Sequence, residues 1–145
     1  MKIKNTRSAL ISNYEVFDLV NDRISYQKQI QQSQSNVDYP EHLRTIQFEL
    51  VEYIKGTPTS TQSEDQVKAF LQQIDRYSLT LGEKVQVLNL RPKSAVEIYL
   101  LIEECEERFS EEDLDNILSI ISTTLPRPDE DDDGIEEMEQ ALETQ

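Results

Sequence analysis

Residues 79–126 read LTLGEKVQVLNLRPKSAVEIYLLIEECEERFSEEDLDNILSIISTTLP, and this stretch decides the fold. Three times it places a hydroxyl three residues before a carboxylate, in the pairs Thr80 and Glu83, Ser94 and Glu97, and Ser110 and Asp113. A hydroxyl at a helix N-cap accepts from a free backbone N–H, and an acid three positions later bonds back to the cap. The spacing therefore predicts three short helices joined by tight turns.

Similar signals occur in the rest of the chain. Ser63 and Gln66 form a fourth capping pair, and Ser12 or Asn13 can cap a helix that runs to about residue 30. Pro40 suits the first turn of another helix, which Gly56 ends. The chain has only three Gly and five Pro, which argues against a turn-rich β architecture. We therefore predict an all-α protein.

Apolar residues recur at helical spacing in each predicted helix, and they mark the faces expected to be buried. In the order of the chain these candidate core residues are Leu43, Ile46, Leu50 and Ile54; Val67, Phe70, Leu71 and Ile74; Val85 and Leu88; Val96, Tyr99, Leu100 and Cys105; and Leu114, Ile117, Leu118 and Ile121.

The two ends of the chain differ from this helical part. Met1 and Ile3 alternate with lysines, which predicts a short strand without a partner strand in its own chain. Such a strand must pair with an edge elsewhere or stay disordered. We expect a partner-docking region at 1–62, a compact helical domain at 63–126 and a disordered acidic tail at 127–145.

The charge distribution indicates the kind of partner. The net charge is −15, and the nine acids and one base of residues 127–145 contribute −8 of it. Residues 1–126 carry the remaining −7, so no large basic face is available for phosphates. A basic protein is the better electrostatic expectation than a nucleic acid. A single cysteine excludes an internal disulfide, and no window approaches 18 apolar residues.

No set of residues predicts catalysis, and we expect neither an enzyme nor a cofactor. His42 is the only histidine and is interpreted as a surface residue. Cys105 lies among four glutamates, which disfavour the thiolate, so an inert thiol is expected. Asp129, Asp131, Asp133 and Gly134 match the start of a calcium loop, but Gln140 stands where a bidentate Glu is required. We interpret this run as a solvated tail.

Lys84, Arg91 and Lys93 surround the break between the predicted fourth and fifth helices. Three bases beside strongly acidic helices make a weak phosphate site. Salt bridges, with Glu97 as one candidate, or a subunit contact are the favoured interpretation, and RNA binding is the alternative.

Several segments together resemble one known family. They are Leu88-Asn89-Leu90-Arg91-Pro92, Ala95-Val96-Glu97-Ile98-Tyr99, Glu103 to Phe109, Ser8 to Val16, and Thr45 to Pro58. In this order they resemble the smaller stalk subunit of RNA polymerase III, a family also called the calcitonin gene-related peptide receptor component protein in animals. The likeness covers about residues 1–126 and leaves the acidic tail outside.

The resemblance implies an HRDC-like helical domain and a heterodimer with a larger OB-fold subunit. This dimer would form a nuclear polymerase stalk that contacts initiation factors and the polymerase core. The unpaired N-terminal strand and the apolar residues that follow it predict a partner-binding surface. Its predicted residues are Ile3, Leu10, Ile11, Tyr14, Phe17, Leu88 and Leu90. Packing of Tyr14 and Phe17 against the second predicted helix, and of Leu88 and Leu90 in the core, are the alternatives. An acidic surface for factor contacts is predicted at Glu103, Glu104, Glu107, Glu111 and Glu112.

Two alternatives from other functional classes stay open at this point. The second family name suggests a receptor-associated signalling adaptor, although the sequence has no lipidation signal. The HRDC-like domain suggests a free nucleic-acid-binding module, against which the negative charge argues.

Overall fold

The computed structural model describes residues 4–6, 8–34 and 36–126. Ile3 of the predicted strand and the tail with its partial calcium loop lie outside these described residues. The elements are α1 (Asn13–Ser33), α2 (Glu41–Lys55), the 3₁₀ turn η1 (Pro58–Thr61), α3 (Glu64–Ile74), α4 (Leu81–Leu90), α5 (Ala95–Leu101), α6 (Cys105–Arg108) and α7 (Glu111–Thr124). The prediction of an all-α protein is confirmed.

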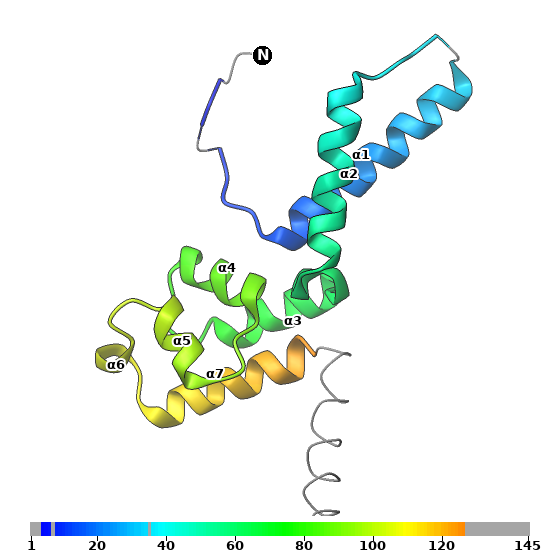
Figure 1. Cartoon of the computed structure of the whole chain (residues 1–145). Helices are drawn as coiled ribbons and strands as arrows, with labels where there is room; N and C mark the ends of the chain where they lie inside the picture. Colours follow the sequence, from blue (N-terminus) through cyan, green and yellow to red (C-terminus); the bar gives the residue numbers. More distant parts are fainter. Residues whose placement is uncertain (1–3, 7, 35, 127–145) are drawn as a thin grey trace, which may run out of the picture.

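The helices form two groups (Figure 1). The long helices α1 and α2 lie against each other as a hairpin that extends away from a compact group formed by α3 to α7. The turn η1 joins the two groups, because it follows α2 directly and contacts α4. The N-terminal hairpin is therefore connected to the compact group through η1 and the end of α4.

The hydrophobic core lies in the compact group. Phe70, Ile74, Val87, Ile98 and Ile117 are completely buried and come from α3, α4, α5 and α7. Helix α7 lies along α3 and closes the core. Burying one such side chain contributes roughly 1.5–3 kcal/mol, so this group supplies most of the apolar stabilisation among the described residues.

All four predicted hydroxyl caps form. Ser63, Thr80 and Ser110 each make a complete capping box with the third residue of their helix. Ser94 accepts from the backbone N–H of Glu97, but that carboxylate accepts from the N–H of Lys93 rather than from the cap. Ser12, one of two candidates for the first helix, forms a fourth complete box.

The fifth helix differs from the expectation. It ends at Leu101, and a separate turn of helix, α6, begins at Cys105 after Glu104 adopts a left-handed conformation with φ of 51°. Val96 and Leu100 are 68% and 82% exposed, so the predicted face is wrong, and Ile98 is buried instead. Because residues 95–102 are apolar on nearly every side, periodicity could not select the buried face.

The predicted N-terminal strand is not confirmed, because residues 4–6 and 8–12 form no strand. A strand needs an edge to pair with, and the described helices offer none. The turn η1 lies between α2 and α3, and its Thr59 is fully buried. Ile46 was predicted to be in the core but is 63% exposed, while Gln47 takes its place on the packed face of α2.

A partly buried ion pair connects the start of α4 to the end of α6. Glu83 accepts from both terminal nitrogens of Arg108, at 2.6 and 3.1 Å, and also from the backbone N–H of Thr80 at 2.8 Å. Arg108 further donates to the carbonyl of Ser78 at 2.6 Å. The hydrogen bond from Arg108 is the main cause that lowers the pKa of Glu83 from its usual 4.5 to about 2.

This lowered pKa predicts acid sensitivity. The charged form of Glu83 stabilises the fold above pH 4.5, and this contribution disappears as the pH falls from 4.5 to about 2. Glu83→Gln keeps the capping geometry but should lower the free energy of unfolding at pH 7 by about 2–3 kcal/mol. Urea unfolding measured at pH values from 7 to 2 checks this. Between pH 4.5 and about 2, the free energy of unfolding should fall less for Glu83→Gln than for wild type.

Glu106→Gln is the matched control for this test, because it removes the same charge from an exposed position on α6. If the free energy of unfolding fell equally in acid for Glu83→Gln, wild type and Glu106→Gln, the stabilising role of the Glu83 carboxylate would be contradicted.

Arg91 joins three segments of the chain. Its guanidinium donates to the carbonyl of Pro58 at 2.7 Å, to the hydroxyl of Thr61 at 2.8 Å and to the carbonyl of Pro126 at 2.6 Å. The residue is 2% exposed, and its backbone is left-handed with φ of 49°. A non-glycine residue in this conformation costs roughly 1–3 kcal/mol, so the surrounding contacts must offset that cost.

Replacing Arg91 should therefore weaken the connection between the two groups. Arg91→Met leaves the Pro58 and Pro126 carbonyls without this donor and should lower the free energy of unfolding by roughly 3 kcal/mol. Hydrogen exchange should also accelerate at the η1 amides. Arg76→Met, at an exposed arginine just after α3, is the matched control. Equal stabilities of the two variants would show that the three hydrogen bonds contribute nothing net.

Candidate partner-docking surface

The first turn of α1 is fixed against the end of α4. Ser12, which is buried, forms the capping box with Glu15, whose carboxylate accepts from the backbone N–H of Ser12 at 2.7 Å. The backbone N–H of Asn13 donates to the side-chain oxygen of Asn89 at 2.9 Å. These bonds hold the preceding residues Leu10 and Ile11 beside the compact group, where they are 56% and 42% exposed.

A hollow of about 400 Å³ lies where the start of α1 meets α3 and α4. Its apolar lining consists of Leu10, Val67, Leu71, Leu81, Val85 and Leu88. Leu81 is 63% exposed, whereas Leu88 is 3% exposed and belongs to the core as well. The hollow therefore joins three predicted partner-binding residues, Leu10, Tyr14 and Leu88, from distant parts of the sequence.

The polar rim of the hollow carries both signs of charge. Glu64 and Lys68 form an ion pair at 2.7 Å, and Lys84 pairs with Asp75 at 2.7 Å. Tyr14 also lines the hollow, and burial, followed by the nearby Asp18, raises the pKa of its hydroxyl. The phenol therefore stays neutral and can take part in an apolar contact.

The hairpin itself exposes further large apolar side chains. They are Leu19 and Tyr26 on α1, and Ile46, Phe48 and Tyr53 on α2, each between 52% and 70% exposed. The side chains of Tyr14 and Phe17 are only half-buried at the start of α1. Large exposed apolar surface on a polar protein is typical of an interaction site. Ile46 was assigned to a packed stripe, so this part of the exposed surface was missed.

The predicted acidic surface lies around α6 and the start of α7. Glu103, Glu104, Glu107, Glu111 and Glu112 are all exposed. Glu111 and Glu112 also occupy the first turn of α7, where the helix dipole stabilises negative charge. Their position thus has a structural reason in addition to any contact with a partner.

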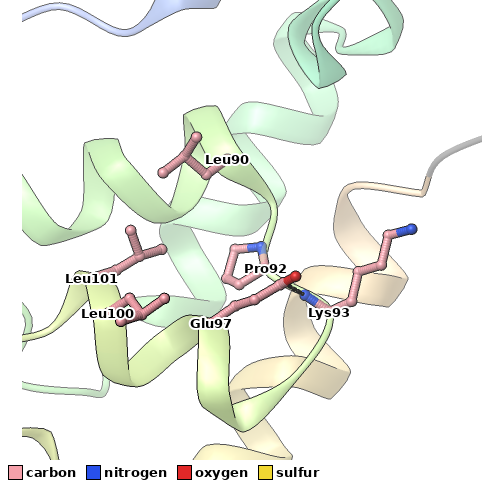
Figure 2. A pocket seen from close by; sticks show the side chains of 6 residues that line it. All are labelled: Leu90, Pro92, Lys93, Glu97, Leu100 and Leu101. Carbon is pink, nitrogen blue, oxygen red and sulfur yellow. Dashed lines mark hydrogen bonds between the residues drawn. The ribbon is translucent and has the colours of Figure 1, made fainter.

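Leu90 lies in a different place from the other predicted docking residues. Figure 2 shows it at the edge of a second hollow, of about 270 Å³, with Pro92, Leu100 and Leu101. Leu90 and Leu100 are 50% and 82% exposed. The two hollows lie on different sides of α4, so the structure separates Leu90 from Leu10 and Leu88.

The three bases considered for RNA binding do not form one basic face. Lys84 pairs with Asp75, Arg91 is buried, and Lys93 follows Arg91 at the exposed turn before α5. The predicted contact with Glu97 involves the backbone N–H of Lys93 at 2.6 Å. This arrangement agrees better with the structural interpretation than with a phosphate site.

The remaining candidate residues have ordinary surroundings. His42 is exposed on α2. Cys105 is buried, and burial raises the pKa of its thiol, as expected for an inert cysteine. Within the described ranges, no cluster of three or more His, Cys, Asp or Glu side chains could hold a metal ion. None of the helices between residues 13 and 124 combines the length and apolar character needed to cross a membrane.

Comparison with known proteins connects this architecture to a polymerase family. The family model "RNA polymerase Rpb4" matches residues 10–125. A relative from Schizosaccharomyces pombe, the DNA-directed RNA polymerase III subunit rpc9, is 33% identical over 87% of this chain and 100% of its own length. The subunit of the same name from Dictyostelium discoideum is 28% identical over 85% of this chain and 88% of its own.

A shorter match adds the RNA polymerase III subunit RPC9 of Saccharomyces cerevisiae, 32% identical over 43% of this chain and 39% of its own. These matches confirm the resemblance to a stalk subunit of RNA polymerase III, and they indicate a non-catalytic polymerase subunit. The chain belongs to the RNA polymerase Rpb4 family.

Proposed function

We propose that this chain is a non-catalytic subunit of RNA polymerase III that acts in the nucleus as half of a stalk heterodimer. The observation that carries the proposal is the similarity to a polymerase III subunit along that relative's entire length. The second half of the stalk would be a larger subunit with an OB-fold, and the heterodimer would associate with the polymerase core and support transcription initiation.

The N-terminal region would dock on the larger subunit. Residues 1–62 contribute Ile3, Leu10, Ile11, Tyr14 and Phe17, and the hollow between α1, α3 and α4 would receive an apolar part of the partner. This assignment is supported by the exposure of Leu10 and Ile11 next to a rigid, capped helix start. Exposed apolar side chains around a preformed hollow have the anatomy of an interface core.

The proposed roles of Leu88 and Leu90 differ. Leu88 would form the bottom of the first hollow and would itself make little contact with the partner, because its side chain is almost fully buried. Leu90 would not share that contact, since it lines the second hollow. The exposed glutamates around α6 would face the initiation factors, where complementary charge accelerates association.

The docking proposal predicts that Leu10→Asp combined with Ile11→Asp weakens binding to the larger subunit. Each exposed apolar side chain should contribute roughly 1–2 kcal/mol when buried, so Kd should rise about 100-fold. Isothermal titration calorimetry with the purified larger subunit measures this change. Val96→Asp, at a side chain 68% exposed on α5, is the matched control. Unchanged affinity of the double variant would remove Leu10 and Ile11 from the interface.

The acidic surface predicts a salt-dependent effect on factor contacts. Glu103→Gln with Glu107→Gln raises the net charge by two at exposed positions that cap no helix. Association of the reconstituted polymerase with initiation factors should be several-fold slower than for wild type at low salt. The difference should vanish at high salt, because salt screens the long-range attraction in both proteins.

Gln72→Lys with Gln73→Lys is the control for this experiment, since it makes the same change in net charge on the exposed side of α3. Equal slowing by both pairs would mean that overall charge, and not the surface around α6, determines the rate.

A further inference from the structure

The outer side of α5 carries an apolar stripe formed by Val96, Tyr99 and Leu100. Val96 precedes Tyr99 by three residues and Leu100 by four, so the three side chains share one face of the helix. They are between 38% and 82% exposed, because α5 turns its other side inward and buries Ile98 completely. An apolar helix face is normally packed against a core, so a stripe of this kind on a polar protein indicates a contact surface.

Two hollows meet this stripe, because Leu100 lines one of them and Tyr99 lines the other. The first, here called the Leu90 groove, is the hollow of Figure 2, where Leu90, Leu100 and Leu101 are directed toward the same space. Its volume is about 270 Å³. This size suits the side chains of a docked segment rather than a globular domain.

The second hollow at the stripe, here called the Tyr99 hollow, lies between α5 and α6 and has a volume of about 410 Å³. Its lining combines apolar surface with carboxylates. The lining residues are Tyr99, Ile102, Glu104, Cys105, Glu106 and Glu107. An apolar side chain can therefore enter this hollow beside a positive charge that pairs with the glutamates.

The surroundings of the stripe are strongly acidic. Residues 94–112 contain seven exposed glutamates and one base, Arg108, which is held in the ion pair with Glu83 at 2.6 Å. Burial, followed by the charge of Glu106, raises the pKa of the Tyr99 hydroxyl, so this carboxylate acts directly on the stripe. A partner docked here gains from positive charge beside its apolar residues.

The backbone of α5 determines the form of the partner. Main-chain groups inside a helix are already hydrogen-bonded, so an added strand would find no edge to extend. A second helix can instead lay a row of apolar side chains along the stripe and place them in both hollows. Another copy of this chain would bring the same seven glutamates to the contact, and nucleic acid would also be repelled.

We propose that the α5 stripe and its two hollows dock a helical segment of a partner protein that has apolar side chains on one face and lysines or arginines beside them. This inference deepens the acidic surface proposed for factor contacts and rests on it, because Glu104 and Glu107 line the Tyr99 hollow. The apolar side chains supply affinity, and the carboxylates select a basic helix over a neutral or acidic one.

The test titrates the full chain with a synthetic amphipathic helical peptide of leucines and lysines. One leucine of the peptide is replaced by tryptophan, whose fluorescence reports docking because this chain contains no tryptophan. Val96→Ser with Leu100→Ser should raise Kd about 30-fold, since the variant removes two apolar contacts. Leu19→Ser with Ile46→Ser, at exposed side chains of the hairpin, is the matched control and should change Kd less than about twofold. Circular dichroism verifies that both variants keep their helices.

A second peptide, with every lysine replaced by glutamine, tests the charge requirement. It should bind wild type about tenfold more weakly than the lysine peptide at low salt, and the difference should shrink at high salt because the attraction is screened. Glu106→Gln should raise Kd about threefold for the lysine peptide only. Glu49→Gln, at an exposed position on α2, is its control and should have no such effect.

Equal Kd values for the stripe variant and the hairpin control, or for the lysine and glutamine peptides, would overturn the proposal. Sedimentation velocity without peptide tests the other occupant: dimerisation of wild type that Leu100→Ser abolishes would identify a second copy and also overturn it. The titration contains neither polymerase nor initiation factors. A failure of factor association with intact peptide binding would therefore contradict the proposed function alone, and the two failures are distinguishable.

Discussion

The guanidinium of Arg91 is the point on which the architecture depends. It bonds the carbonyl of Pro58 in η1, the hydroxyl of Thr61 and the carbonyl of Pro126 after α7. Within the part of the chain that the structure describes, the main cluster of buried hydrophobic residues lies between Phe70 and Leu125 and contains no member from α1, α2 or η1. The planar guanidinium presents its donors in a fixed fork spread over three nitrogens, so it can reach acceptors from separate segments, whereas lysine carries its three donors on a single nitrogen.

The residues around Arg91 show how one short segment can serve several surfaces. Leu88 enters the core, and its carbonyl accepts from the side chain of Gln62 at 2.7 Å. Asn89 accepts from the first turn of α1, whereas Leu90 and Pro92 line the groove on another side. The left-handed turn at Arg91 makes this possible, because it ends α4 and sends successive side chains in different directions. The compact group and the hairpin therefore share one positioning element.

Sequence reasoning succeeded where local chemistry determines structure. Hydroxyl caps such as Thr80 and Ser110 mark helix starts because their partners lie only three residues away. It failed at α5, where residues on nearly every side are apolar, and at Ile46, which is exposed although it fits a helical stripe. The role of Arg91 was also missed, because its partners lie about 30 residues away and a sequence shows no burial. Long-range polar contacts leave no periodic signal.

The hairpin and the compact group differ in how their order is maintained. Ile54 is the one large apolar residue of α1 and α2 that is fully buried, and Gln27 and Gln47 fill other packed positions. A helix pair with so few buried apolar contacts lies at the low-stability end of a structure. Side chains such as Leu19, Phe48 and Tyr53 still carry the apolar area that a core would need. That area can contribute stability only when another surface covers it, so partner binding and hairpin stability are thermodynamically linked.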